Sequence, residues 1–446
     1  MILMNKFMLI CAPVSSRSGY GDHARDLVLA FLDDDKYDIK ILDVPWGETP
    51  RNALNKENKT DKKILDCILT DNKVSQQPDV YVDIRIPNEF QQYGKFNIGI
   101  TAGIETHAVS SAWIEGCNKM DLIIVPSEHS KAGFVNTIYD KVNDQQQNIG
   151  QLKLEKPMEV LFEGASEMFK PLHHKEIDSK FFDWLNAEVP EKFAFLQVGL
   201  WGHQPYGEDR KDVARTIKIF YESFANKKKQ PALILKTNGA GFSILDKENI
   251  LDRIKEIKSQ FPSDWKLPNV YLLHGQLSIE EMNYLYNHPK VKAMVSFTHG
   301  EGFGRPMLEA TMTGLPVIAS NWSGQLDFLN EEVSMLLPGK LSQIPKSVVW
   351  NDILIEQSEW FTVDENVAYK AFNYAFENFE ELKSKAKEQM KLNEKYTLKN
   401  MSVKLHELLD SHMKSAPVAV GLNLPKLKKT SDDKSNKITL PKLKKV

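Results

Sequence analysis

The segment Ser296–Leu329, which reads SFTHGEGFGRPMLEATMTGLPVIASNWSGQLDFL, decides the fold. A buried strand is predicted to end near Phe297 and a helix to begin at about Pro306, with the glycine-rich loop Gly300–Gly304 between them. The apolar run 315–320 then predicts a second strand. A strand, a helix and a further strand in this order favour a parallel sheet that is covered by helices.

The same alternation fills most of the chain. Further apolar runs that predict buried strands lie at 7–14, 38–46, 79–86, 97–104, 121–127, 193–201, 232–239, 269–275 and 291–298. Segments with helical spacing lie between several of these runs, at 21–32, 109–120, 213–226 and 278–287.

The alternation pauses once, at 157–174, where a strand is followed by turn-forming glycine and proline residues. We therefore predict an α/β protein with two Rossmann-like, doubly wound parallel-sheet domains, one at 1–165 and one at 170–392. The ligand-binding loops of the two domains are expected to face a common cleft. A helix at about 395–413 is expected to pack back on the first domain.

The composition is that of a globular protein, with 42% hydrophobic and 26% charged residues among 446. No apolar run is long enough to cross a membrane, and the short apolar start is expected to be a strand rather than a signal peptide. Three widely spaced cysteines (Cys11, Cys67 and Cys117) predict neither a disulfide framework nor a zinc site. A reducing cytoplasm is the expected location.

The last 26 residues differ in kind from the rest. They hold eight Lys and two Asp, about +6, so a net charge of −3 for the whole chain leaves about −9 on the remainder. NLPKLKK at 423–429 and TLPKLKK at 439–445 nearly repeat. We expect 415–446 to be a disordered, Lys-rich tail. Two linked motifs are typical of a bivalent docking peptide for a protein, a nucleic acid or an acidic membrane surface, and a purely solubilising tail is the alternative.

The glycine-rich loop and the helix after it predict a site for a phosphate-bearing ligand, because the first amides of a helix lack intrahelical partners and attract anions. Gly302 and Gly304, on either side of Phe303, let the backbone approach a ligand closely. Glu301 and Glu309 are separated by seven residues. Because one carboxylate accepts hydrogen bonds from two neighbouring hydroxyls, we predict one of them for a sugar and the other for a nucleotide ribose.

These residues carry a resemblance. GEGFGRPMLEA at 300–310, with the TGLPVIAS and SGQLDFL that follow, resembles the Glu–seven residues–Glu signature of family 4 of the retaining glycosyltransferases. The resemblance implies the GT-B fold and transfer of a sugar from a nucleotide-sugar, such as a UDP- or GDP-sugar, with no separate cofactor. In that family the first Glu lies near the donor sugar and the second binds the ribose, roles that carry over to Glu301 and Glu309.

Two other segments resemble the donor domain of that family. QVGLWGHQPYGEDRKDVARTIKIF places Arg210 and Lys211 where a basic pair meets the diphosphate, although Leu200 stands where many members have a basic residue. VYLLHGQLSIEEMNYLY resembles the strand and loop that contact the nucleobase through backbone atoms, with Gln276 and Leu277 as the candidates. Solvated charges at a helix start and ordinary loop structure are the respective alternatives.

The first domain offers four further candidates. SSRSGYGDHARDL follows the first strand and opens a helix, so Gly19 and Gly21 are expected to admit a phosphate or an acceptor, although two glycines alone are a weak signal. The region GITAGIETHAVSSAWIEGCNKMDLIIVPSEHSKAGF resembles the acceptor side of the family. Glu105 and His107 lie just past a strand end there, and they join Glu301 as candidates for catalysis. A hydrogen-bonded structural role is the alternative for both.

The resemblance also implies a mechanism in which the leaving diphosphate helps to deprotonate the acceptor hydroxyl. No Asp-x-Asp follows a strand of this site, so a catalytic metal is not expected. The candidate acceptors are a glycan, a lipid-linked acceptor and, because some sequences similar to EGFGRPMLEA come from phages, modified-base DNA; a phage-encoded member would lie in the host cytoplasm. Another GT-B enzyme, such as a nucleotide-sugar epimerase, and an inactive binding protein that acts through its tail remain alternatives.

Overall fold

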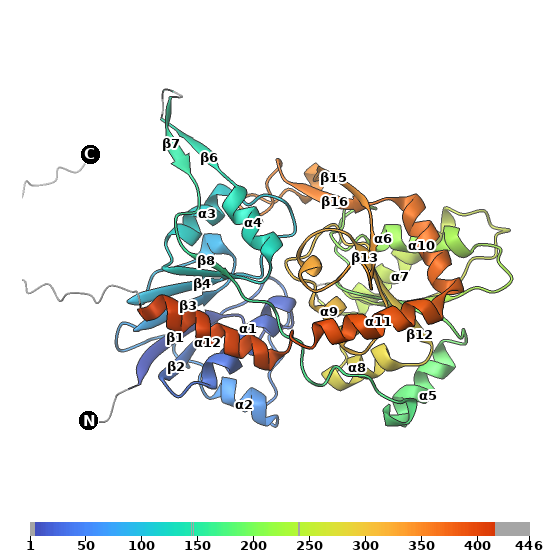
Figure 1. Cartoon of the computed structure of the whole chain (residues 1–446), viewed down its shortest axis with the longest axis horizontal. Coiled ribbons are helices and arrows are strands. Elements are labelled where there is room, and N and C mark those ends of the chain that lie inside the picture. The colour runs from blue at the N-terminus through green and yellow to red at the C-terminus, as the bar shows by residue number, and fades with distance from the viewer. Residues whose placement is uncertain (1–4, 144, 146, 240, 415–446) are drawn as a thin grey trace, which may run out of the picture.

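The computed structural model describes residues 5–143, 145, 147–239 and 241–414. The tail predicted at 415–446, with both LPKLKK copies, lies outside the described residues. Two α/β domains lie side by side in Figure 1, which confirms the predicted fold class. None of the helices described is long and apolar enough to cross a membrane.

The first domain is built on a parallel sheet of six strands in the order β2-β1-β3-β4-β5-β8. The strands are β1 (Lys6–Ala12), β2 (Tyr37–Asp43), β3 (Val80–Ile84), β4 (Phe96–Ile100), β5 (Leu122–Val125) and β8 (Met158–Val160). Four helices accompany them, α1 (Gly19–Leu32), α2 (Lys59–Leu65), α3 (Ser111–Asn118) and α4 (Glu128–Asn136). The strand predicted at 97–104 ends early, because the chain turns at Gly103, whose φ of 81° is unfavourable for other residues.

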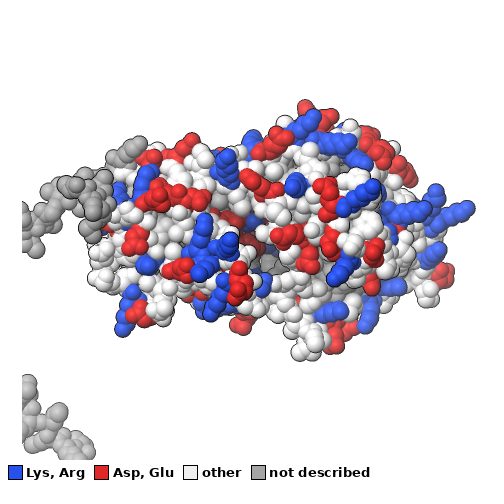
Figure 2. Space-filling view, turned by 90° about the horizontal axis from the view of Figure 1, so that it is seen from below, with Lys and Arg blue, Asp and Glu red and all other residues white. Residues whose placement is uncertain are grey.

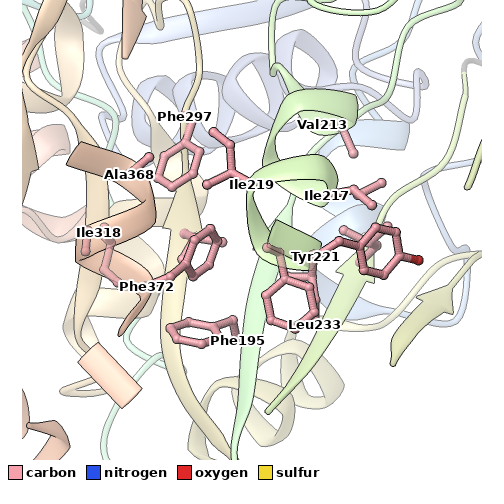
Figure 3. Close-up of a cluster of buried hydrophobic side chains, with 14 of the residues drawn as sticks. Phe195, Val213, Ile217, Ile219, Tyr221, Leu233, Phe297, Ile318, Ala368 and Phe372 are labelled. Carbon is pink, nitrogen blue, oxygen red and sulfur yellow. The ribbon is translucent and has the colours of Figure 1, made fainter. Parts of the chain in front are cut away.

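The second domain repeats this plan with the strand order β11-β10-β9-β12-β13-β14, again all parallel. Its strands are β9 (Ala194–Val198), β10 (Ala232–Lys236), β11 (Val270–Leu273), β12 (Val291–Ser296), β13 (Val317–Ser320) and β14 (Met335–Leu337). Its helices are α5 (Ser179–Glu188), α6 (Val213–Phe224), α7 (Ile244–Ser259), α8 (Ile279–Asn287), α9 (Arg305–Met312), α10 (Glu365–Glu377) and α11 (Phe379–Asn393). Figure 3 shows one side of its core, where Phe372 of α10 packs against Phe195 of β9.

Two antiparallel hairpins were not predicted. β6 (Tyr139–Val142) pairs with β7 (Asn148–Leu152) and projects from the first domain, and β15 (Gly339–Gln343) pairs with β16 (Glu359–Val363) at the second (Figure 1). Short 3-10 turns occur at Pro87–Glu89, His174–Glu176, Gly324–Asp327 and Lys346–Val348. Their short or mixed polar sequences lack the long periodic pattern that made the sheet strands predictable.

The chain crosses between the domains twice, and the two crossings are hydrogen-bonded to each other. Ala165 donates its N–H to the carbonyl of Tyr396 at 2.9 Å and accepts from Leu398 at 3.1 Å. After the second crossing, helix α12 (Leu398–Lys414) packs against α1 and buries Leu405 and Leu409 in the core of the first domain (Figure 1). The last helix thereby fastens the end of the second domain to the first.

Replacing Leu405 with Ala tests this fastening. Leu405 is fully buried, so its truncation should lower the free energy of unfolding by about 3 kcal/mol. Val403, on the same helix, is 52% exposed, and Val403→Ala should change the free energy by less than about 0.5 kcal/mol. Urea unfolding followed by circular dichroism measures both variants. Equal effects of the two substitutions would contradict the packing of α12.

Candidate functional site

The loop after β12 is shaped by its glycines. Gly304 precedes the first residue of α9 and has a φ of 101°, a left-handed conformation that L side chains rarely adopt. A Cβ at this position would also lie 2.9 Å from the side chain of Met307. Pro306 follows in the first helical turn, where its missing N–H costs no hydrogen bond. The predicted strand, glycine-rich loop and helix are therefore present.

Glu301 points from this loop onto two basic side chains. Its carboxylate accepts a hydrogen bond from Nη1 of Arg210 at 3.0 Å and a second one from Nζ of Lys211. Only 8% of the Glu301 side chain is exposed. The residues predicted to hold the donor sugar (Glu301) and the diphosphate (Arg210 and Lys211) are therefore in direct contact, although 90 positions separate Lys211 from Glu301.

The charges of this cluster are strongly coupled. Burial opposes ionisation of Glu301, but Lys211 and Arg210 outweigh it and hold the pKa of the carboxyl below its usual value. Burial lowers the pKa of Lys211, and Glu301 partly offsets that effect. Two carboxylates, those of Glu301 and Glu105, face the two cations, so the cluster is balanced in charge, and an anionic ligand would compete with these acids for Arg210 and Lys211.

Backbone contacts hold the two loops of this cluster together. The carbonyl of Arg210 accepts from the N–H of His299 at 2.8 Å and from the hydroxyl of Thr298 at 3.1 Å. His299 is itself buried, and its ring stacks on Trp360 with a centroid distance of 4.1 Å. The segment before α6 is thus hydrogen-bonded to the loop after β12, which places Arg210 beside Glu301.

Glu309 lies in a second cluster, on the first turns of α9. It accepts from Nε of Arg305 at 3.0 Å, and the hydroxyl of Tyr286 lies 3.5 Å from its other oxygen. Arg305 also donates to Asp26 of α1 at 2.5 Å and so bridges the two domains. Glu163, on the first crossing between the domains, is buried beside this arginine and these acids. Part of the hydrogen-bonding capacity of Glu309, the predicted ribose ligand, is therefore already used.

Burial raises the pKa of Glu163 and of Glu309 to about 7, from an ordinary value of 4.5, although Arg305 lowers both. Between pH 4.5 and pH 7 these two carboxyls bind protons in the folded protein but not in the unfolded chain. Each of them therefore makes the free energy of unfolding fall as the pH rises, by up to about 3 kcal/mol above pH 7. We expect Glu163→Gln and Glu309→Gln to stabilise the protein at about pH 8 and to lose this advantage near pH 5. Urea unfolding at both pH values measures this, with the exposed Glu332→Gln as the control. A pH-independent effect would contradict the raised pKa values.

The loops after β12 and β4 touch backbone to backbone. A Cβ on Gly302 would lie 1.9 Å from the carbonyl oxygen of Ala102, and a Cβ on Gly300 would lie 1.9 Å from that of Glu105. The carbonyl of Gly302 also accepts a hydrogen bond from Ser127 at 2.6 Å. Gly302 was expected to make room for a ligand, and in the structure it makes room for the first domain.

The catalytic candidates of the first domain take different places. Glu105 lies across the domain gap from the basic pair, with its Oε1 3.4 Å from Nε of Arg210. The ring Nδ1 of His107 accepts a hydrogen bond from the backbone N–H of Glu359 at 2.8 Å. The backbone N–H of His107 donates to the carbonyl of Glu359 at 3.2 Å. His107 therefore joins the first domain to β16, whereas Glu105 faces the cluster around Glu301.

Phe303, Gln276 and Leu277 are predicted site residues that belong to neither charged cluster. The side chain of Phe303 is buried in the core beside Phe328. Gln276 is exposed and Leu277 packs partly on the core, in the loop whose Gly275 carbonyl accepts from Lys236 at 2.6 Å.

At the start of α1 the two predicted glycines differ. A Cβ on Gly21 would lie 2.2 Å from the carbonyl oxygen of Ser16, whereas one on Gly19 would meet nothing within 4 Å. Ser18 caps this helix by accepting from the N–H of Gly21 at 3.0 Å. Close packing therefore accounts for Gly21, and the space around Gly19 is open.

Five residues of the site as described were not predicted from the sequence: Asp26, Glu163, Lys236, Tyr286 and Arg305. The sequence did carry a signal for Lys236, because this lysine ends the apolar run ALILK. It therefore stands at the carboxyl end of a buried strand, where ligands of parallel sheets bind. Burial lowers the pKa of Lys236 to about 8. Figure 2 shows the surface hollowed between the two domains, with charged side chains of both signs around the hollow. Among the described residues, no group of three His, Cys, Asp or Glu is placed to hold a metal ion.

Residues 217–342 match the family model described as "Glycosyl transferases group 1". This range contains Glu301 and Glu309. No curated protein sequence matches the chain significantly. The second domain therefore carries a glycosyltransferase group 1 domain, and the protein is a glycosyltransferase.

Solved structures share the fold over nearly the whole chain. Sucrose-phosphate synthase from Thermosynechococcus elongatus is 14% identical with a TM-score of 0.59, and the match covers 92% of this chain and 100% of the other. Anabaena HepE, in complex with UDP and glucose, is 12% identical with a TM-score of 0.57, covering 91% and 100%. A glycosyltransferase from Rickettsia africae is 12% identical with a TM-score of 0.57, covering 92% and 99%. At these identities the likeness shows the GT-B architecture.

Proposed function

We propose that the protein is a retaining glycosyltransferase of the family 4 type, which moves a sugar from a nucleoside-diphosphate sugar to an acceptor hydroxyl in the cytoplasm. The observation that carries the proposal is the convergence of Arg210 and Lys211 on Glu301 between the two domains. A nucleotide-sugar needs cations for its diphosphate and hydrogen-bond acceptors for its hydroxyls, and this cluster supplies both.

In the proposed complex, the donor lies between the two domains. Its diphosphate contacts Arg210 and Lys211, which without a donor are neutralised in part by Glu301. The hydroxyls of the transferred sugar donate to Glu301. The ribose donates to Glu309, and the loop at Gln276 and Leu277 meets the nucleobase. HepE, which shares the fold, was solved with UDP and glucose, which supports a UDP-sugar as the first donor to test.

The reaction breaks the bond between the anomeric carbon and the diphosphate oxygen, and that oxygen keeps the electron pair. The acceptor oxygen forms the new bond on the same face of the sugar, and its proton passes to the leaving diphosphate. Arg210 and Lys211 stabilise the negative charge that develops on the diphosphate, so the site works without a metal. The seam between the domains, where Gly300 and Gly302 lie against the backbone of Ala102 and Glu105, keeps water away from the anomeric carbon.

The acceptor binds on the side of the first domain, where Glu105 faces the cluster. We propose a glycan, a lipid-linked acceptor or modified-base DNA as its class. The Lys-rich tail would dock the enzyme near that acceptor, on a protein, a nucleic acid or an acidic membrane surface.

The decisive experiment supplies UDP- and GDP-sugars and first scores the thermal stabilisation of the protein. A donor at about 100 times its dissociation constant adds about 2.7 kcal/mol. Products made with the stabilising donor and a panel of the three acceptor classes are then examined by NMR. An α-linked product from an α-linked donor, with one nucleoside diphosphate released per transfer, is the expected result. An inverted linkage would contradict the retaining mechanism, and no stabilisation by any nucleotide-sugar would contradict the proposed function.

A further inference from the structure

A pocket of about 590 Å³ lies on the second domain, at the opposite end of β12 from Glu301. The link around His173, the ends of α8 and α9, the start of β12 and one face of α11 line it. Glu301 follows the carboxyl end of β12, whereas Lys292 lies near its amino end. The strand has six residues, so about 20 Å separate the pocket from Glu301.

The charge of the pocket has one sign. Lys292, Lys383, Lys387 and Lys391 line it, and no Asp or Glu is among the lining residues. The last three are four positions apart on α11, where like charges destabilise a helix slightly. Lys385 of the same helix pairs with Glu381 at 3.0 Å, whereas among the described residues the four pocket lysines form no ion pair.

The electrostatic potential in the pocket acts on one of these lysines. Lys292 is half-buried, and burial lowers its pKa, with a further lowering by Lys383 and an opposing effect of Glu380. A bound anion would attract each lysine and so offset the repulsion between them. The Nζ atoms of Lys292 and Lys383 also lie over the ring of Phe379, 4.7 and 5.9 Å from its centroid, whereas Lys387 and Lys391 have no such ring contact among the described residues.

The rest of the pocket is apolar and firmly built. Phe379, Met390 and Pro316 contribute apolar surface. The opposite wall is fixed by Asn287, which accepts from the N–H of Leu172 at 2.7 Å and donates to the carbonyl of Lys170 at 2.9 Å.

We propose that this pocket is a second binding site, for a small molecule that carries a phosphate monoester on a ring. The phosphate would contact the lysines of α11, and the ring would lie against the apolar wall. The volume lies within the usual range for small-molecule sites. The chain's own Lys-rich tail is not the occupant, because it has the same sign of charge. Tyr286 lines the pocket and also reaches Glu309, so the two sites share one side chain.

Calorimetric titration at low ionic strength tests the proposal, because salt would screen the lysines. The probe is glucose 6-phosphate, and it is compared with glucose, which lacks the phosphate. The pocket variant is Lys383→Gln with Lys387→Gln. The control is Lys247→Gln with Lys385→Gln, which makes the same change of net charge outside the pocket.

Glucose 6-phosphate is expected to bind the wild type and the control equally, and to bind the pocket variant at least about tenfold more weakly. Glucose should not bind. The proposal is overturned if glucose 6-phosphate does not bind the wild type below about 10 mM, or if it binds the pocket variant as tightly as the wild type. Equal weakening in the control would overturn it too. The titration requires no sugar transfer, so its failure is distinguishable from failure of the proposed function.

Discussion

Replacing Glu301 with Gln is expected to lower kcat for sugar transfer by about 100- to 1,000-fold while nucleoside diphosphate binds as tightly as before or more tightly. The two effects have opposite signs because the carboxylate has two kinds of partner. It neutralises Arg210 and Lys211 in the absence of a donor, and in the proposed complex it accepts from the transferred sugar. A neutral amide leaves more positive charge for the diphosphate and less stabilisation for the sugar.

Initial rates and calorimetry with UDP separate the two effects. Arg210→Gln is the complementary variant, because it removes a cation and should weaken UDP binding by about tenfold. Glu332→Gln, at an exposed carboxylate, should leave both quantities unchanged. Circular dichroism and stabilisation by UDP show whether each variant is folded. An unchanged kcat for Glu301→Gln, or a loss of UDP binding in the folded variant, would remove Glu301 from its assigned role.

The sheets were predictable from the sequence because each buried strand is a short apolar run between turn residues. ALILK of β10 and VKAMVS of β12 have this form, and both lie in the middle of the parallel sheet. The hairpins were not predictable. The strand NIGQL of β7 is nearly all exposed, so it carries neither a buried run nor a clear alternation.

The site divides in the same way. Glu301 and Glu309 share one short segment, so their spacing is readable in the sequence. Arg305 and Asp26 are 279 positions apart, and no local pattern announces that an arginine on one domain will meet an aspartate on the other. The pairing depends on how the two domains face each other, which only the three-dimensional structure gives.

Gly302 shows how one residue type supports two different explanations. A glycine in this loop indicates that another atom comes close, but the sequence does not tell whether that atom belongs to a ligand or to the protein. In the structure it is the carbonyl oxygen of Ala102 in the first domain. The glycine is therefore a requirement of the seam between the domains.

Gly302→Ala is accordingly expected to force this seam apart. The new Cβ would lie 1.9 Å from the carbonyl oxygen of Ala102, and because that atom is backbone, no side-chain rotation relieves the clash. Separation would also break the hydrogen bond from Ser127 to the carbonyl of Gly302. We expect sugar transfer to fall by about 100-fold, because Glu105 and the cluster around Glu301 would no longer face each other at a fixed distance.

Solution scattering and circular dichroism distinguish this effect from unfolding. The variant should have a larger radius of gyration and an unchanged helix signal. Gly241→Ala is the matched control, because a Cβ there meets nothing within 4 Å, and it should keep both the activity and the scattering of the wild type. If Gly302→Ala retained full activity and an unchanged radius of gyration, the contact with Ala102 would not be what holds the domains in register. The loop glycine would then have to serve the ligand, as its sequence context first indicated.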